Sequence, residues 1–250
     1  MSIFGKIKEV YKRQMQTNEF VHDTRIKTHI NFELGRTNLA FQLLDKLTAQ
    51  GPYFPVTSPT INQFSILQVL NDIVVNDRKC FVEFGAGFST LLASRLKRLN
   101  GLDIKIISVE SDAGWLEFVS GMLQKEGALQ DVEFVHAPLT PCEIGFQKPG
   151  KWYDREPIRA ALSTAPKCDV VLVDGPAAYN PDIMYSRYPA FEVMKPFMAD
   201  SFTFFLDDIN RKGEDQILDK WAEQSGYQKI KLSATFGVIA RNLRFHPFYQ

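Results

Sequence analysis

The sequence predicts an α/β fold built on a doubly wound, mostly parallel sheet, and two patterns carry this prediction. From Cys80 onward, short apolar runs rich in β-branched and aromatic residues alternate with stretches in which apolar residues recur at helical spacing. Residues 169–174 form an apolar run between two aspartates, which is typical of a central parallel strand buried on both faces. Sheets of this kind bind their ligands at the carboxyl ends of the strands.

The composition fits one such domain. With 250 residues, 45% of them hydrophobic, the chain is long enough for an α/β core with an N-terminal addition. The 29 Lys+Arg and 29 Asp+Glu residues cancel, so no overall field favours nucleic acid or an anionic membrane. Three cysteines without CxxC spacing indicate reduced thiols, and no apolar run approaches the roughly 20 residues of a membrane span. We expect a cytoplasmic protein with no nucleic-acid partner.

Residues 1–57 precede the alternating part and are predicted to form a helical cap, with residues 58–250 as the main domain. A breaker cluster at 51–55 marks the boundary, and Ser58 is predicted to cap a helix that begins at Pro59. One face of the first helix is apolar, which predicts that it packs on the domain or on a second subunit of a homodimer. The residues of this face are Ile3, Phe4, Ile7, Val10 and Tyr11.

The chain around Gly85 is predicted to be a strand, a tight turn and the start of a helix. An apolar run ends at Glu83, the turn Gly85-Ala86-Gly87 follows, and helical spacing begins near Ser89. This layout presents backbone N–H groups to a nucleotide-like ligand. Gly85 can adopt backbone angles closed to other residues, and Gly87 lets the chain approach a ligand without a Cβ in the way.

The remaining elements follow in turn, and the helix after Glu110 is expected to be capped by Ser111 or Asp112. The other predictions are helices over 38–47, 89–99, 152–162 and 212–224, strands over 104–109, 132–135 and 202–206, an irregular insert over 138–151, and a closing antiparallel pair over 227–232 and 235–240.

Titratable side chains stand where the predicted strands end. Packing alone needs no charge there, so five carboxylates on four strand ends indicate a ligand site at one edge of the sheet. Glu110 lies 25 residues after Gly85, where an acid accepts the ribose hydroxyls of a bound nucleoside, as in NAD or S-adenosylmethionine (SAM). The strand-end residues are Glu83, Glu110, His136, Asp174, Asp207 and Asp208.

The glycine pattern separates these two cofactors. A dinucleotide fingerprint requires G-x-G-x-x-G, and Thr90 occupies the position of the third glycine. An acid two residues before the first glycine, Glu83, also suits a cofactor with a cationic amino-acid end better than a pyrophosphate. An NAD-dependent dehydrogenase is therefore the weakest alternative.

At residues 83–89 the chain resembles the class I SAM-dependent methyltransferases, whose first motif is E/D-x-G-x-G-x-S/T. Glu110 matches the ribose-binding acid of that family, and Asp174 matches its acid at the end of strand four. The resemblance covers residues 58–242. It implies a Rossmann-like, seven-stranded, mostly parallel sheet with an N-terminal helical cap, and SAM as cofactor. The implied cofactor-binding residues are Glu83, Gly85, Ala86, Gly87, Ser89, Glu110, Ser111, Ala137 and Asp174.

One subset of this family has acidic residues at the same strand ends as this chain. Asp-Gly after strand four and Asp-Asp after strand five resemble the metal-dependent O-methyltransferases that act on catechols and sugars. This likeness implies that Asp174, Asp207 and Asp208 hold Mg²⁺, which prefers carboxylate oxygens and promotes loss of a bound hydroxyl proton. The catechol type has a lysine three positions after the first acid, where this chain has Ala177. Either the base differs or the metal is absent.

We expect an enzyme that moves the SAM methyl group to a small, hydroxyl-bearing acceptor. The candidate bases are Asp174, a metal at the two aspartates, and His136, in that order. Arg187 and Arg211 either clamp an anionic acceptor or pair with the acids, and Trp152 and Tyr153 either stack on the acceptor or fill the core. The alternatives are an aminopropyl transferase that uses decarboxylated SAM, and a SAM-binding or oligomerising protein without catalysis.

Overall fold

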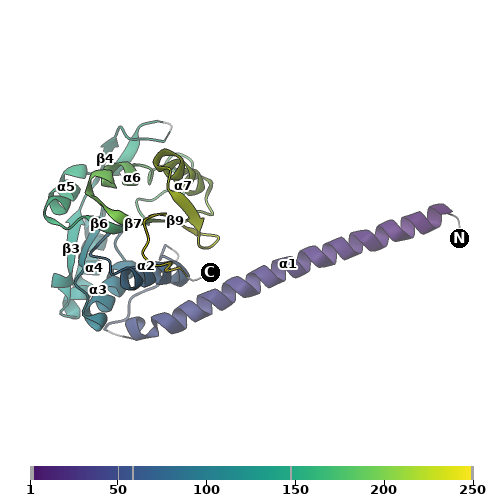
Figure 1. Ribbon diagram of the computed structural model, residues 1–250, viewed down its shortest axis with the longest axis horizontal. Coiled ribbons are helices and arrows are strands. Elements are labelled where there is room, and N and C mark those ends of the chain that lie inside the picture. The colour runs from purple at the N-terminus through teal and green to yellow at the C-terminus, as the bar shows by residue number, and fades with distance from the viewer. Residues whose placement is uncertain (1–2, 50, 58, 147, 249–250) are drawn as a thin grey trace. The chain divides into compact units, whose positions relative to one another are not determined.

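The computed structural model describes residues 3–49, 51–57, 59–146 and 148–248. The chain divides into two compact units, Met1–Leu43 and Leu44–Gln250. Helix α1 (Ile3–Thr48) is one continuous helix of 46 residues, drawn in purple in Figure 1. It contains the predicted helix 38–47 and continues it toward the N-terminus. Within the described residues, no helix has the length and apolar character needed to cross a membrane.

The apolar face predicted for the first helix is described only in part. The side chains of Ile3, Phe4, Ile7 and Val10 lie outside the described residues, and Tyr11 is exposed. The packing partner of this face, whether the domain or a second subunit, stays a prediction.

The second unit is built on a seven-stranded sheet in the order β3-β2-β1-β6-β7-β9-β8. The first five of these strands are parallel neighbours, whereas β9 is antiparallel to both β7 and β8. This confirms the predicted doubly wound, mostly parallel sheet with a closing antiparallel pair. The strands are β1 (Cys80–Phe84), β2 (Lys105–Glu110), β3 (Val132–His136), β6 (Cys168–Val173), β7 (Met198–Asp207), β8 (Gln228–Lys231) and β9 (Phe236–Arg241).

Helices cover both faces of the sheet, as the alternation of elements requires (Figure 1). On one face of the sheet, α3 and α4 contact each other and β2, and α2 contacts α3. On the other face, side chains of α5, α6 and α7 pack into one apolar core. The helices are α2 (Gln63–Val75), α3 (Phe88–Asn100), α4 (Ala113–Lys125), α5 (Arg155–Thr164), α6 (Pro189–Met194) and α7 (Lys212–Ser225), with 3₁₀ turns at Leu129–Asp131 and Lys195–Phe197.

Two local predictions were wrong. Helix α2 begins at Gln63 rather than at Pro59, because Asn62 is its N-cap and accepts a hydrogen bond from the backbone N–H of Phe64 at 2.8 Å. Ser58, the predicted cap, lies outside the described residues. The insert over 138–151 is not irregular: β4 (Leu139–Cys142) and β5 (Gly150–Tyr153) pair as an antiparallel hairpin. Strand β5 therefore takes the start of the stretch predicted to be helix 152–162.

The register of the parallel strands brings the predicted strand ends to one level. Phe84 of β1 lies opposite Val109 of β2 and Val173 of β6, and Val173 lies opposite Leu206 of β7. The residues that follow are therefore neighbours along one edge of the sheet. These residues are Glu110, Gly85, Asp174 and Asp207.

Candidate functional site

A cavity of about 440 Å³ opens at the carboxyl ends of the central strands. Its size lies within the range of about 300–1,000 Å³ that is typical of small-molecule sites. Most of the predicted site residues line it. They are Gly85, Ala86, Gly87, Ser89, Glu110, Ser111, Tyr153, Asp174, Arg187, Asp207, Asp208 and Arg211.

The glycine turn after β1 forms one wall of the cavity. Gly85 has φ +103°, and a Cβ there would lie 3.1 Å from the backbone nitrogen of Gly175, so both conformation and space require glycine. Gly87 directly precedes α3, and a Cβ on it would meet nothing within 4 Å. The space in front of Gly87 is therefore available to a ligand.

Glu83 is completely buried and does not line the cavity. Its carboxylate accepts hydrogen bonds from the hydroxyls of Ser89 at 2.6 Å, of Ser108 at 2.7 Å and of Thr90. Burial raises the pKa of Glu83 to about 7, against the opposing effect of these hydroxyls. The Glu83 carboxylate is thus enclosed by hydroxyls, one of which belongs to Ser89 of the cavity lining, and its expected role at the amino end of a cofactor stays a prediction.

Glu110 is held by backbone N–H groups from two loops. Its Oε1 accepts from the N–H of Ser111 at 2.6 Å and of Asp112 at 2.9 Å, and its Oε2 accepts from the N–H of Ala86 at 3.2 Å. Asp112, the second of the two predicted caps, accepts from the N–H of Trp115 at 2.8 Å and begins α4. Glu110 is thus oriented beside the glycine turn, at the edge of the cavity.

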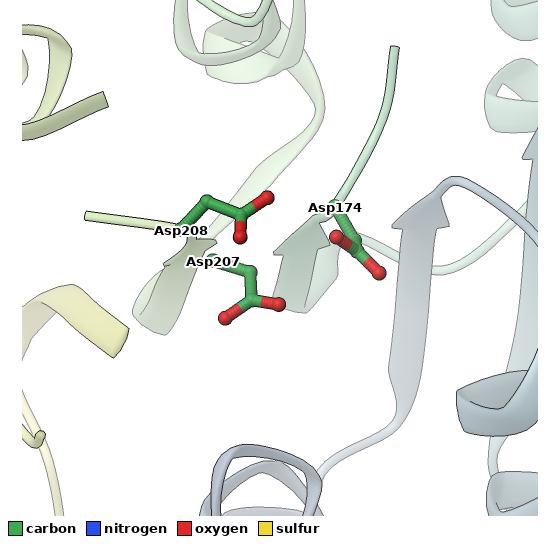
Figure 2. A group of neighbouring side chains, drawn as sticks. All are labelled: Asp174, Asp207 and Asp208. Carbon is green, nitrogen blue, oxygen red and sulfur yellow. The ribbon is translucent and has the colours of Figure 1, made fainter. Parts of the chain in front are cut away.

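Three carboxylates converge at the ends of β6 and β7, and we call Asp174, Asp207 and Asp208 the acidic group. Figure 2 shows their side chains turned toward a common space, and one oxygen of each lies within 4.8 Å of the others. Asp208 has φ +63°, an uncommon conformation for a residue with a side chain. Such strain is typical of functional sites.

Burial and mutual repulsion perturb these acids. The pKa of Asp174 is raised to about 6, first by burial and then by the charges of Asp208 and Glu110, with Arg187 opposing. The pKa of Asp207 is raised well above its usual range by burial and by Asp174 and Asp208. The acidic group therefore favours a bound proton or a cation.

Arg187 pairs with the acidic group from below the surface. Its buried guanidinium lies 3.1 Å from an oxygen of Asp208 and 3.6 Å from one of Asp174. It also donates to the carbonyl oxygens of Pro176 at 3.1 Å and Asp207 at 3.2 Å, and to that of Asp174. Of the two predicted roles for Arg187, the structure therefore favours pairing with the acids over clamping an acceptor.

Arg211 is more accessible. Its side chain is 39% exposed, and its Nη1 lies 2.9 Å from Asp208 and 3.5 Å from Glu214. Because only one end of the guanidinium is engaged in these pairs, Arg211 retains donors at the mouth of the cavity.

The donor set suits a divalent cation. Mg²⁺ takes oxygen ligands at about 2.0–2.1 Å, so oxygens around one ion lie within roughly 4 Å of each other. The separations of up to 4.8 Å in the acidic group require only small side-chain movements to reach this geometry. Arg187 already neutralises part of the charge, which lowers the affinity for the ion without removing the ligands.

Besides Glu83, three predicted site residues lie outside the cavity lining. His136 is exposed, with Nε2 3.2 Å from the carbonyl oxygen of Ser111. Ala137 is fully buried beneath the same edge. Trp152 is also fully buried, its ring 5.3 Å from that of Phe84, so of its two predicted roles the structure favours filling the core.

Some lining residues carried no signal in the sequence. Four of them belong to the segment between α1 and α2, whose described residues form neither helix nor strand and therefore show no periodicity. Trp115 is another: its indole N–H donates to the carbonyl oxygen of Ala86 at 2.7 Å and closes the cavity beside the glycine turn. The four are Phe54, Thr57, Thr60 and Ile61.

Comparison with known proteins identifies the fold. No family model and no curated protein matches the sequence. Solved structures match with a TM-score of 0.54 for a protein of Staphylococcus aureus assigned as a caffeoyl-CoA O-methyltransferase, at 12% identity over 86% of this chain and 98% of that one. A methyltransferase of Podospora anserina bound to S-adenosylhomocysteine (SAH) matches with a TM-score of 0.53, at 12% identity over 83% of this chain and 88% of that one.

A third structure agrees with these two. The precorrin-6y C5,15-methyltransferase of Geobacter metallireducens gives a TM-score of 0.51, at 15% identity over 78% of this chain and 96% of that one. At such identities the likeness is one of fold. It confirms the predicted Rossmann-like methyltransferase fold.

Proposed function

We propose that the protein transfers the methyl group of SAM to a small, hydroxyl-bearing acceptor. The observation that carries this proposal is the arrangement of one cavity along the sheet edge. The glycine turn and Glu110 line one part of it, and the acidic group lines the other, with Gly85 between them. A cofactor and an acceptor bound in these two parts would meet near the end of β1.

The cofactor part is suited to an adenosyl amino acid. Glu110 is oriented by three backbone N–H groups, and its Oε2 accepts only one of them, so this oxygen keeps a lone pair for a ribose hydroxyl, with Ser111 beside it. The open space at Gly87, with Ala86 and Ser89 alongside, suits the methionine part. The fold shared with a SAH-bound structure supports this assignment.

The acceptor part is suited to a hydroxyl group. Asp174 lies next to Gly85 along the edge, and a pKa raised to about 6 makes it an effective base near neutral pH. In the reaction, the acceptor oxygen attacks the methyl carbon, the bond from carbon to sulfur breaks, and the acceptor proton passes to Asp174. The protein contributes mainly by aligning the three reacting atoms. Arg211 at the mouth offers donors to the rest of the acceptor.

A divalent metal remains part of the proposal. Asp174, Asp207 and Asp208 would hold it, and a bound Mg²⁺ would make an acceptor hydroxyl more acidic. His136 is the least supported of the predicted bases, because it lies outside the cavity lining. Without the ion the proposed base is Asp174; with the ion bound, Asp174 would be one of its ligands, and the ion itself would promote loss of the hydroxyl proton.

Localisation and assembly are proposed with it. Three buried, free cysteines support a reducing compartment, hence the cytoplasm. The homodimer predicted from the N-terminal helix rests on the sequence pattern alone.

The proposal is tested at Gly87. Substituting Gly87→Val places a side chain in open space at the cavity wall, at an extended φ of 167° that other residues adopt. Gly150→Val is the matched control: Gly150 also has nothing within 4 Å of a Cβ, but it lies outside the cavity lining. Calorimetry should show SAM binding at least about tenfold weaker in Gly87→Val, a loss of about 1.4 kcal/mol, and unchanged in the control. Equal affinity in all three proteins would overturn the site.

A further inference from the structure

The hydroxyl of Tyr153 reaches the cavity from a hairpin outside the main sheet. Its side chain is 2% exposed, and its ring stacks on Phe84 at 5.7 Å and meets Trp152 edge-on at 5.5 Å. Of the two predicted roles of this ring, stacking on an acceptor or filling the core, the structure therefore favours the core. Tyr153 nevertheless lines the cavity, and its oxygen lies beside Gly175, which lines the cavity as well.

This hydroxyl lies at the meeting point of the two parts of the cavity. A Cβ on Gly175 would come within 2.2 Å of the Tyr153 oxygen, and the same Cβ would lie 3.2 Å from the Cα of Gly85. Gly85 follows β1 and Gly175 follows Asp174 of the β6 end. The Tyr153 oxygen is thus between the cofactor part and the acceptor part.

The hydroxyl has no hydrogen-bond partner among the residues that the structure describes. Its oxygen is not among the fully enclosed polar atoms that lack a partner, so it is accessible from the cavity. Burial, followed by the charge of Glu110, raises the pKa of Tyr153 well above its usual range, so the group is a neutral phenol. It offers two lone pairs and one proton to whatever occupies the cavity.

We propose that the Tyr153 oxygen contacts the sulfonium end of bound SAM. This inference rests on the proposed function. If the ribose lies at Glu110 and the acceptor at Asp174, the sulfur and its methyl group lie between β2 and β6, close to the Tyr153 oxygen beside Gly175 and Gly85. The lone pairs of a neutral phenol are attracted to the sulfonium charge and to its polarised methyl hydrogens.

The contact depends on charge, which makes it selective. When the methyl group leaves, the sulfonium becomes the neutral sulfide of S-adenosylhomocysteine (SAH), and the attraction to the phenol oxygen is lost. Tyr153 therefore favours the substrate cofactor over the product. A role in packing alone would not distinguish the two ligands, because they share every other group.

The test is calorimetric titration of Tyr153→Phe with SAM and with SAH. This substitution keeps the ring and removes only the oxygen. Tyr188→Phe is the matched control, because Tyr188 is also buried, but its hydroxyl pairs with Gln224 at 3.2 Å outside the cavity lining. We expect SAM affinity to fall about tenfold in Tyr153→Phe while SAH affinity changes less than about twofold. The control should leave both unchanged.

The outcomes separate this inference from the proposed function. If the unmodified protein binds SAM and SAH, but Tyr153→Phe weakens both equally, weakens SAH more, or weakens neither, the sulfonium contact is wrong and the function stands. If the unmodified protein binds neither ligand, the proposed function itself fails. Thermal unfolding of both variants shows whether any loss of affinity comes from a loss of folded protein.

Discussion

The guanidinium of Arg187 lies 3.1 Å from the carboxylate of Asp208. The same group donates to backbone carbonyls at the ends of β6 and β7, so one buried cation joins the two strand ends that carry the acidic group. Asp174, Asp207 and Asp208 are buried or half-buried acids that repel each other, and Arg187 is what allows them to stand together.

Removing this cation should destabilise the fold. Arg187→Met leaves the surrounding carboxylates without their counter-ion, and breaking a buried pair in this way costs about 3–5 kcal/mol. Urea unfolding at pH 7 should show a loss of this size in the free energy of unfolding. The control is Arg211→Met, whose partly exposed ion pair contributes less than about 1 kcal/mol. Equal losses in the two variants would contradict this account of Arg187.

Glu83 should make stability depend on pH. Its pKa is raised from 4.5 to about 7 in the folded protein, so the folded state holds a proton that the unfolded state has released between these values. The contribution of Glu83 to the free energy of unfolding is therefore greatest below about pH 4.5. It falls by about 3 kcal/mol in all as the pH rises to 7. Glu83→Gln has no proton to lose.

The measurement is the free energy of unfolding from pH 5 to pH 8, for the unmodified protein and for Glu83→Gln. Other buried acids titrate in both proteins, so the difference between the two curves isolates Glu83. We expect the unmodified protein to lose more stability than the variant as pH rises. Parallel curves would show that Glu83 keeps an ordinary pKa.

The acidic group should bind a divalent cation. Calorimetry with Mg²⁺ or Mn²⁺ in the presence of SAM should detect binding that Asp207→Asn removes, because Asp207 supplies one of the three carboxylates. Asp182→Asn, an exposed acid outside the cavity lining, is the control and should bind the ion normally. If the unmodified protein binds neither ion, the metal is excluded from the proposal and Asp174 acts as the base alone.

The residues at the carboxyl ends of the strands could be predicted because a short stretch of sequence is enough to recognise each strand end. An apolar strand that ends in an acid, as at Glu110, Asp174 and Asp207, is visible in the sequence, and parallel register then brings such ends together. The glycine turn was predicted for the same reason: the φ of +103° at Gly85 requires the residue type that the sequence contains.

Side-chain direction and irregular backbone could not be predicted in this way. Trp152 and Tyr153 are adjacent in the sequence and both buried, yet only Tyr153 reaches the cavity, because its place in β5 sets it against Gly175. Strands β4 and β5 are short and contain Pro141 and Gly150, so they resembled a loop. Arg187 was recognised as a candidate, but its partners come from two strand ends far apart in sequence.

The central claim is that the cavity binds SAM, and titration of the unmodified protein with SAM tests it most directly. Decarboxylated SAM and NADH serve as comparisons, because the aminopropyl-transferase alternative requires the first and a dehydrogenase the second. We predict micromolar binding of SAM, weaker binding of decarboxylated SAM and no binding of NADH. Absence of SAM binding, or a preference for decarboxylated SAM, would contradict the account.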